Sequence, residues 1–241
     1  METNKAIVFD TGPIISLTLN NLLWLLRPLK EKANGQFYIC PSVYYELIQK
    51  PLKTKKYKFE ALQILPFFMD GTLKMHVEKE TRKKAKELLE LANTSFIGKG
   101  SHINVVHMGE MEAIATALTL GSNTLVIDER TTRLLIENPY SLLDHLKKKL
   151  HTNIDVDRDK IERLKEEISH IKVIRSFELG IAAYELGLLD RYMLKEEEKL
   201  DEIDDIKSSV LEGVLWAIKL SGCSVTTEDI KKVLKLEKSN S

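Results

Sequence analysis

The sequence is short of cysteine and aromatic residues and carries no net charge, and each shortage argues against a class of protein. Its 241 residues include two cysteines, Cys40 and Cys223, whose positions show no paired spacing. This argues against both a disulfide framework and a zinc site. Basic and acidic residues number 36 each. Binding to nucleic acid would therefore have to depend on a local patch and not on a global positive field.

Long hydrophobic runs are also missing. No apolar stretch approaches the roughly 20 residues that a membrane-spanning helix requires. The N-terminus leads into a strand-like segment and not into a signal-peptide core, so we expect a cytoplasmic protein that does not contact membranes. Hydrophobic residues make up 43% of the chain and charged residues 30%, a composition typical of a globular protein. The length suits either one large domain or one domain with an appendage.

The most informative stretch is residues 109–133, which reads as a helix followed by a strand. Met111, Ile114, Ala115 and Leu118 have the spacing of a buried helix face. Residues 125–127 are apolar and predict a short buried strand, and Asp128 follows it directly. In an open α/β sheet the carboxyl ends of the strands border the ligand crevice. Asp128 is therefore expected at a site of chemistry.

The helix in this stretch carries two glutamates with different expected surroundings. A helical projection places Glu112 on one polar stripe with Thr116 and Thr119, and it places Glu110 inside the apolar arc. A carboxylate in an apolar arc is costly unless a cation or strong donors meet it. We therefore predict that Glu112 is a solvated surface residue and that Glu110 has a functional role.

A second aspartate follows a second apolar run near the N-terminus. Residues 6–9 predict a central parallel strand that ends on Asp10, before Thr11, Gly12 and Pro13. A turn or helix-cap aspartate is the alternative interpretation of Asp10. A phosphatase of the haloacid dehalogenase class also begins with a strand and an aspartate. That class needs a second acid two residues later, where this chain has Gly12.

The segment between these strands supplies a third acid and a basic loop. We expect a helix over 14–29 ending near Pro28, a strand over 37–40, and a helix that starts at Pro41–Ser42, with Ser42 as its N-cap. Glu46 lies in the second turn of that helix, and an ordinary solvated glutamate is the alternative. The loop over 51–58 could contact phosphates or be merely solvated; its lysines are Lys53, Lys55, Lys56 and Lys58. A strand over 73–77, a helix over 80–91 and a loop over 93–107 follow.

The second half of the chain is predicted to be mainly helical. Arg130 and Arg133 lie one turn apart after Asp128, where they could reach phosphates or stay solvent-exposed. Two amphipathic segments, 141–150 and 157–171, are expected to pair as an antiparallel hairpin. Its apolar side (Ile161, Leu164 and Ile168) would pack on the parent domain or on a second copy of the chain. We also expect a strand over 172–174, a helix over 176–189, a charged connector over 195–205, a buried all-round apolar helix over 206–220, and a last helix capped by residues 226–229.

Four motifs, taken together and in this order, resemble a PIN domain. They are the strand ending in Asp10-Thr11, the helix with Glu46-Leu47, Gly109-Glu110 with Glu112-Ala113, and Val126-Ile127-Asp128-Glu129 with Arg133. The nearest resemblance is to archaeal and bacterial PIN proteins similar to VapC-type toxins. It covers most of the chain apart from residues 137–171. No single motif is specific, but the ordered set of four is moderately so.

This resemblance implies a three-layer α/β/α sandwich with a central parallel sheet. It places a PIN-like domain at 1–194, with a helical insertion at about 137–171, and a helical C-terminal extension at 195–241. It implies that Asp10, Glu46, Glu110 and Asp128 bind Mg²⁺ or Mn²⁺, the hard cations that carboxylates prefer. Residues implied to support them or the substrate are Thr11, Ser176, Glu129, Arg130 and Arg133. The chain departs from the family at Arg175-Ser176, where Gly with Thr or Asn is common, and in the length of the insertion.

The expected activity is metal-dependent endonucleolytic cleavage of single-stranded RNA. Two alternatives stay open: a catalytically weak PIN module that binds RNA or a protein, and a DNA-directed nuclease of the same chemistry. Protein partners suggested by the resemblance are a second copy of the chain and an antitoxin-like protein.

Overall fold

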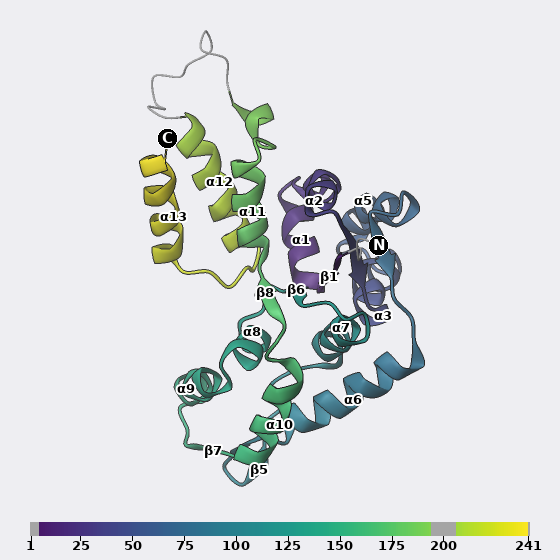
Figure 1. Ribbon diagram of the computed structural model, residues 1–241, viewed down its shortest axis with the longest axis vertical. Helices are drawn as coiled ribbons and strands as arrows, with labels where there is room; N and C mark the ends of the chain where they lie inside the picture. Colours follow the sequence, from purple (N-terminus) through teal and green to yellow (C-terminus); the bar gives the residue numbers. More distant parts are fainter. Residues whose placement is uncertain (1–4, 194–205, 241) are drawn as a thin grey trace.

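A computed structural model describes residues 5–193 and 206–240 of the chain (Figure 1). The predicted charged connector over 195–205 lies outside the described residues. Among the residues described, no helix is both long and apolar enough to cross a bilayer.

A parallel sheet forms the centre of the fold, with the strand order β3-β2-β1-β6-β8. Its five strands are β1 (Lys5–Phe9), β2 (Gly35–Ile39), β3 (Leu73–Met75), β6 (Thr124–Val126) and β8 (Lys172–Ile174). Because β1 lies between β2 and β6, the order reverses there, and ligands of such sheets bind outside the carboxyl ends at the point of reversal. Asp10 and Asp128 follow β1 and β6 at this edge, and the Asp10 amide extends the pairing by donating to the Val126 carbonyl at 2.9 Å.

Helices flank the sheet, so the predicted PIN-like three-layer α/β fold is confirmed. The main helices of residues 5–193 are α1 (Thr11–Leu19), α2 (Leu26–Ala33), α3 (Pro41–Tyr44), α4 (Lys50–Leu52), α5 (Lys58–Met69), α6 (Lys79–Asn93), α7 (Met108–Thr119), α8 (Arg130–Glu137), α9 (Pro139–Leu150), α10 (Arg158–Ile168) and α11 (Ser176–Glu185). Helix α7 packs on β1 and β6 and is covered in turn by α3 and α6. Its residues from Met111 to Ala117 are all buried, as expected of a helix enclosed on every side.

The predicted single helix over 14–29 is wrong. The chain forms α1, then a 3₁₀ turn (η1, Leu23–Leu25), then α2, and Asn21 between them has a left-handed backbone with φ of 55°. Pro28 lies in the first turn of α2, where the missing N–H would have had no partner in the helix. The predicted N-cap at Ser42 is also wrong, because helix α3 begins one residue earlier, at Pro41, after Cys40.

Helix α3 continues through a π-helical turn, η2 (Tyr45–Gln49), into α4. Pro51 explains the wide turn. A proline has no N–H to donate to the carbonyl four residues earlier, and its ring clashes with that carbonyl, so a helix can continue only by kinking or widening there. Glu46 lies on this turn, and π-turns are frequent at functional sites.

The insertion does not form the predicted hairpin. A strand, β7 (Ile154–Val156), separates α9 from α10 and pairs with β4 (Phe96–Gly98), which also pairs with β5 (Ser101–His102). This small antiparallel sheet replaces the loop expected over 93–107 and holds the two helices on different neighbours, α9 on α8 and α10 on α6. The side chains expected to pack either on the parent domain or on a second copy of the chain are at most 1% exposed: Ile161, Leu164 and Ile168. They pack on the parent domain.

Three helices at the C-terminal end stand together beside the sheet (Figure 1): α11, α12 (Ile206–Leu220) and α13 (Thr227–Asn240). The bounds expected for α12 are confirmed, but the helix is not buried all round: its buried side chains are Leu211, Leu215 and Ile218, while Leu220 is 79% exposed. The expected cap of α13 is present. Thr226 and Asp229 accept hydrogen bonds from each other's backbone amides at 3.0 and 3.1 Å.

Candidate active site

Asp10 lies at the end of β1, immediately before helix α1. Its side chain is 8% exposed. Burial and, to a smaller extent, the nearby charges of Glu110 and Glu46 raise the pKa of its carboxyl, and the amides of Thr11 and Gly12 at the start of α1 lower it; the net result is a rise from 3.8 to about 7. Among the described residues, Asp10 forms no ion pair that would offset this burial.

Glu46 reaches the same region from the π-helical turn. Its Oε2 accepts a hydrogen bond from the Thr11 hydroxyl at 2.8 Å, so the residue after Asp10 holds the Glu46 carboxylate. Its Oε1 lies near the start of α7, because a Cβ placed on Gly109 would be 3.7 Å from it. The Glu46 side chain therefore lies between the carboxyl end of β1 and the first turn of α7, although it is exposed to solvent.

Glu110 is the third acid that the fold brings to this place. It occupies the third position of α7, where its Oε2 accepts the backbone N–H of His107 at 3.0 Å, one half of a capping box. The side chain is half-buried, so the prediction that it sits desolvated in an apolar arc is wrong. Its charge nonetheless acts on Asp10 and raises the pKa of that carboxyl. Asp10, Glu46 and Glu110 form one acidic cluster.

Asp128 lies next to this cluster but turns its carboxylate toward two serines. Its Oδ1 accepts the backbone N–H of Ser176 at 2.7 Å, and its Oδ2 accepts the hydroxyls of Ser176 at 2.6 Å and Ser16 at 3.0 Å. Gly12 separates it from Asp10: a Cβ there would lie 3.4 Å from the Asp128 Cβ and 3.9 Å from the Asp10 Oδ2. Ser176 thus contacts an acid of the predicted set, and Asp128 ties α1 to the start of α11.

The prediction that Glu112 is solvated is wrong. Glu112 is 3% exposed, and its Oε2 accepts the Ser42 amide at 2.9 Å. Of the polar stripe that it shares with Thr116 and Thr119, Thr116 is buried as well, whereas Thr119 is exposed at the end of the helix and meets Thr81 of α6 at 3.1 Å. A cavity of about 480 Å³ lies beside both Glu46 and Glu112. A glutamate three residues after a helix start could have indicated the contact of Glu110 with the His107 amide, but no local signal reveals the burial of Glu112.

Three residues expected near the acids have other roles. Glu129 caps helix α8 by accepting the Thr132 amide at 2.6 Å. Arg133 lies 3.6 Å from Glu137, one turn along the same helix. Arg130 is exposed, and its charge adds to burial, the larger cause, in lowering the pKa of His145 on α9. The structure does not bring these three side chains to the acidic cluster.

The basic loop approaches the acidic cluster more closely. A second cavity, of about 560 Å³, is lined by Thr11 and Glu46 and also by Lys50, Lys56 and Tyr57. Of the four lysines predicted to contact RNA, only Lys56 lines this cavity. The other three are exposed: Lys53, Lys55 and Lys58.

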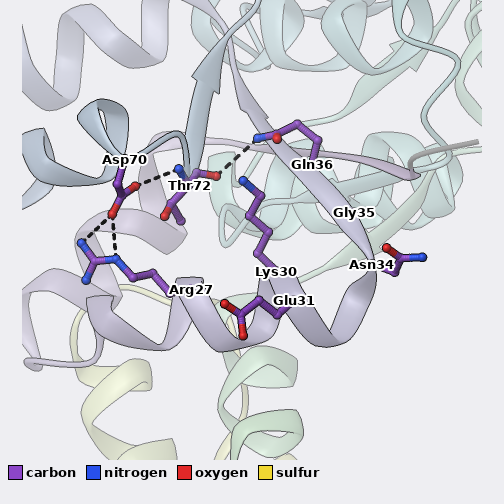
Figure 2. A pocket seen from close by; sticks show the side chains of 8 residues that line it. All are labelled: Arg27, Lys30, Glu31, Asn34, Gly35, Gln36, Asp70 and Thr72. Atoms are coloured by element: carbon purple, nitrogen blue, oxygen red, sulfur yellow. Dashed lines mark hydrogen bonds and ion pairs between the residues drawn. The ribbon is translucent and has the colours of Figure 1, made fainter.

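A third cavity, of about 520 Å³, lies at the opposite edge of the sheet, where β2 and β3 begin (Figure 2). Three of its charged side chains, Arg27, Lys30 and Asp70, have partners. Arg27 pairs with Asp70 at 2.7 Å, and the Lys30 ammonium donates to the Gly71 carbonyl at 2.6 Å. Gln36 also bonds to backbone carbonyls here. These contacts fasten α2 to the segment before β3, far along the strands from the acids.

The acidic cluster suits a hard divalent cation. Within residues 5–193 and 206–240, no group of three or more histidine, cysteine, aspartate or glutamate side chains is placed so that it could hold a metal ion by itself. Mg²⁺ does not need such a group, since it keeps several waters and is commonly held by one or two carboxylates together with substrate phosphates. A buried Asp10 beside two further carboxylates, without a cationic side chain paired to it, is a donor set of that kind.

The cysteines add nothing to this centre. Both are buried and unbonded to each other, and burial raises the pKa of the Cys223 thiol to about 12. Such thiols stay protonated near neutral pH and are poor metal ligands.

Comparison with known proteins gives one match. A family model described as a PIN domain matches residues 6–138, more than half of the chain. No curated protein and no solved structure shows significant similarity to the chain. The matched residues include β1, the π-helical turn, α7 and β6, which carry Asp10, Glu46, Glu110 and Asp128. The chain belongs to the PIN-domain family.

Proposed function

We propose that the protein is a divalent-metal-dependent endonuclease that hydrolyses single-stranded RNA. The PIN domain is a nuclease-type fold. The observation that carries the proposal for this chain is the acidic cluster itself, in which the buried Asp10 has a pKa of about 7 and two glutamates lie beside it. Carboxylates kept together against their mutual repulsion are a recurrent sign of a functional site.

Each acid has a part that its surroundings support. Asp10, Glu46 and Glu110 would hold Mg²⁺ or Mn²⁺, and such an ion, when bound, neutralises phosphate charge and activates water. Thr11 orients Glu46 through its hydroxyl, which leaves the second carboxylate oxygen free to face the start of α7. Asp128 already accepts three hydrogen bonds out of about four that a carboxylate can accept. We assign it to positioning the end of β6, with one lone pair left for a water at the cluster.

The position of positive charge supports a nucleic-acid substrate. The net charge of the chain is zero, but Lys50 and Lys56 line a cavity that Glu46 also lines. Phosphates next to a scissile bond would thus meet cations within the same region as the acids, as binding that depends on a local patch requires. A cytoplasmic location, an antitoxin-like partner and self-association stay predictions.

The test is cleavage of a fluorescent, unstructured RNA by purified wild type, Asp10→Asn and Asp144→Asn in Mn²⁺ and in EDTA. Asp144 is an exposed aspartate on α9, remote from the cluster, and serves as the matched control. We expect cleavage by wild type and Asp144→Asn in Mn²⁺ alone, and none by Asp10→Asn. Binding without cleavage by wild type would favour the non-enzymatic module instead, and preferential cleavage of the DNA analogue would favour the DNA-directed nuclease.

A further inference from the structure

The cavity between α1 and the connection from α4 to α5, which we call the Tyr57 cavity, has a lining unlike that of the acidic cluster. Glu46 lines it together with Thr11, whose hydroxyl holds the Glu46 carboxylate. Ile15 and Pro51 add apolar surface, and Lys50, Lys56 and Tyr57 also line the cavity. Its volume of about 560 Å³ falls within the range of sites that hold a small ligand or one unit of a polymer.

Tyr57 has a backbone conformation that its own side chain disfavours. Its φ is 61°, in the left-handed region, which is uncommon for a bulky residue and costs free energy relative to glycine or asparagine. The residue forms no side-chain cap on helix α5, which follows it, so capping does not account for the choice of tyrosine. A strained aromatic residue at the edge of a cavity points to a use for the ring.

The ring is also available to a ligand. Tyr57 is 40% exposed, and the Lys56 ammonium lies 4.7 Å from its ring centroid. The loop that carries both is held from inside, since the Thr54 hydroxyl donates to the Lys56 carbonyl at 3.0 Å. An aromatic surface next to two lysines combines the two components of single-strand binding, base stacking and phosphate neutralisation.

We propose that the Tyr57 cavity binds the nucleotide next to the scissile phosphate, with its base stacked on Tyr57 and its phosphate near Lys50 and Lys56. This inference rests on the proposed ribonuclease function, because Glu46 is the side chain common to the cavity and the acidic cluster. Stacking uses the face that every base has, so the site selects an unpaired base and not a particular one. A duplex would be excluded, because its bases cannot reach the ring while stacked on their neighbours.

The test measures binding by fluorescence anisotropy in EDTA, where the RNA stays intact. The probes are a labelled octamer of adenylate and a labelled octamer of abasic ribose phosphates. We expect Tyr57→Ala to bind the adenylate octamer about 10-fold more weakly than wild type and the abasic octamer equally well. Tyr57→Phe should keep wild-type affinity for both.

Two controls separate the ring from general effects. Tyr140→Ala removes an equally exposed tyrosine on α9, which does not line the cavity, and should change neither affinity. Lys50→Gln should weaken binding to both octamers alike and reduce its salt dependence, because it removes a phosphate contact and not a stacking surface. Tyr57→Gly relieves the left-handed backbone, so its urea unfolding midpoint should be at least that of wild type while adenylate binding falls as in Tyr57→Ala.

Equal binding of the adenylate octamer by wild type and Tyr57→Ala would overturn the proposal, as would an equal loss on the two octamers. The experiments can distinguish failure of this proposal from failure of the ribonuclease function. If Tyr57→Ala leaves cleavage in Mn²⁺ unchanged, the base-binding site is refuted while the ribonuclease function stands. A Tyr57-dependent loss confined to the adenylate octamer supports the base site whether or not wild type cleaves RNA.

Discussion

Replacement of Asp10 by asparagine should make the metal-free protein more stable, although it destroys the proposed site. Burial and the charges of Glu110 and Glu46 raise the pKa of Asp10 to about 7 in the folded state, against an ordinary value of 3.8 for an aspartate in water. The folded protein therefore keeps a proton between about pH 4 and pH 7 that the unfolded chain has lost. The free energy of unfolding must fall as the pH rises through this window and stay low above it.

The size of the effect follows from the same two pKa values. A difference of about 3 pKa units corresponds to about 4 kcal/mol at 1.36 kcal/mol per unit. Asparagine carries no charge at any of these pH values, and its amide oxygen can still accept from the Thr11 and Gly12 amides. Asp10→Asn should therefore gain up to about 4 kcal/mol at pH 8 and almost nothing at pH 4.

The assay is urea unfolding in EDTA at pH values from 4 to 8.5, followed by circular dichroism. Asp144→Asn is the matched control, since it removes an exposed carboxylate remote from Asp10 and should track wild type throughout. Adding Mn²⁺ should cancel this advantage of Asp10→Asn at about 1,000 times the dissociation constant for wild type and reverse the order above that, because binding at that concentration stabilises wild type by about 4.1 kcal/mol and the variant has lost a ligand. An Asp10→Asn protein that is equal to or less stable than wild type at pH 8 in EDTA would refute the electrostatic reasoning.

Three further substitutions test the contacts around the cluster. Glu112→Ala leaves the Ser42 amide without its acceptor and should cost about 1–3 kcal/mol in urea unfolding; a silent Glu112→Ala would restore the solvated interpretation of this residue. Ser176→Ala removes a charge-assisted hydrogen bond to Asp128 and should cost about 1.5–3 kcal/mol by the same measurement, a loss absent if the bond is not formed in solution. Leu164→Ala should cost about 2–5 kcal/mol through a core cavity and leave the mass measured by light scattering unchanged, whereas a shift in mass would show that this side chain contacts another subunit.

The sheet was predictable because its signals are local. The runs before Asp10 and Asp128 are wholly apolar and short, as strands buried on both faces must be, and each aspartate directly follows its run. The approach of Glu46 to the cluster depends on the π-helical turn. Pro51 marks that turn in the sequence, but the direction in which a widened turn points a side chain depends on what packs around it.

The wrong predictions share a physical cause, which is contact between segments that are distant in the sequence. The polar stripe of α7 was expected to face water because nothing in residues 108–119 indicates that α3 and α6 cover it. Strands β4 and β7 are short, and among the described residues β7 pairs only with β4, more than fifty residues earlier in the chain. The helices around β7 look like a hairpin in isolation, and the pairing of β7 prevents it.

The region matched to the family ends before the sheet is complete. Strand β8, which pairs with β6, and Ser176, which supplies two of the hydrogen bonds to Asp128, both follow residue 138. A fragment cut at the family boundary would expose the β6 edge, with free N–H and C=O groups able to pair with other chains. It would also leave the Asp128 carboxylate short of donors, so such a fragment should aggregate or fold poorly. Biochemical study of this nuclease-type fold therefore calls for protein that extends at least through α11.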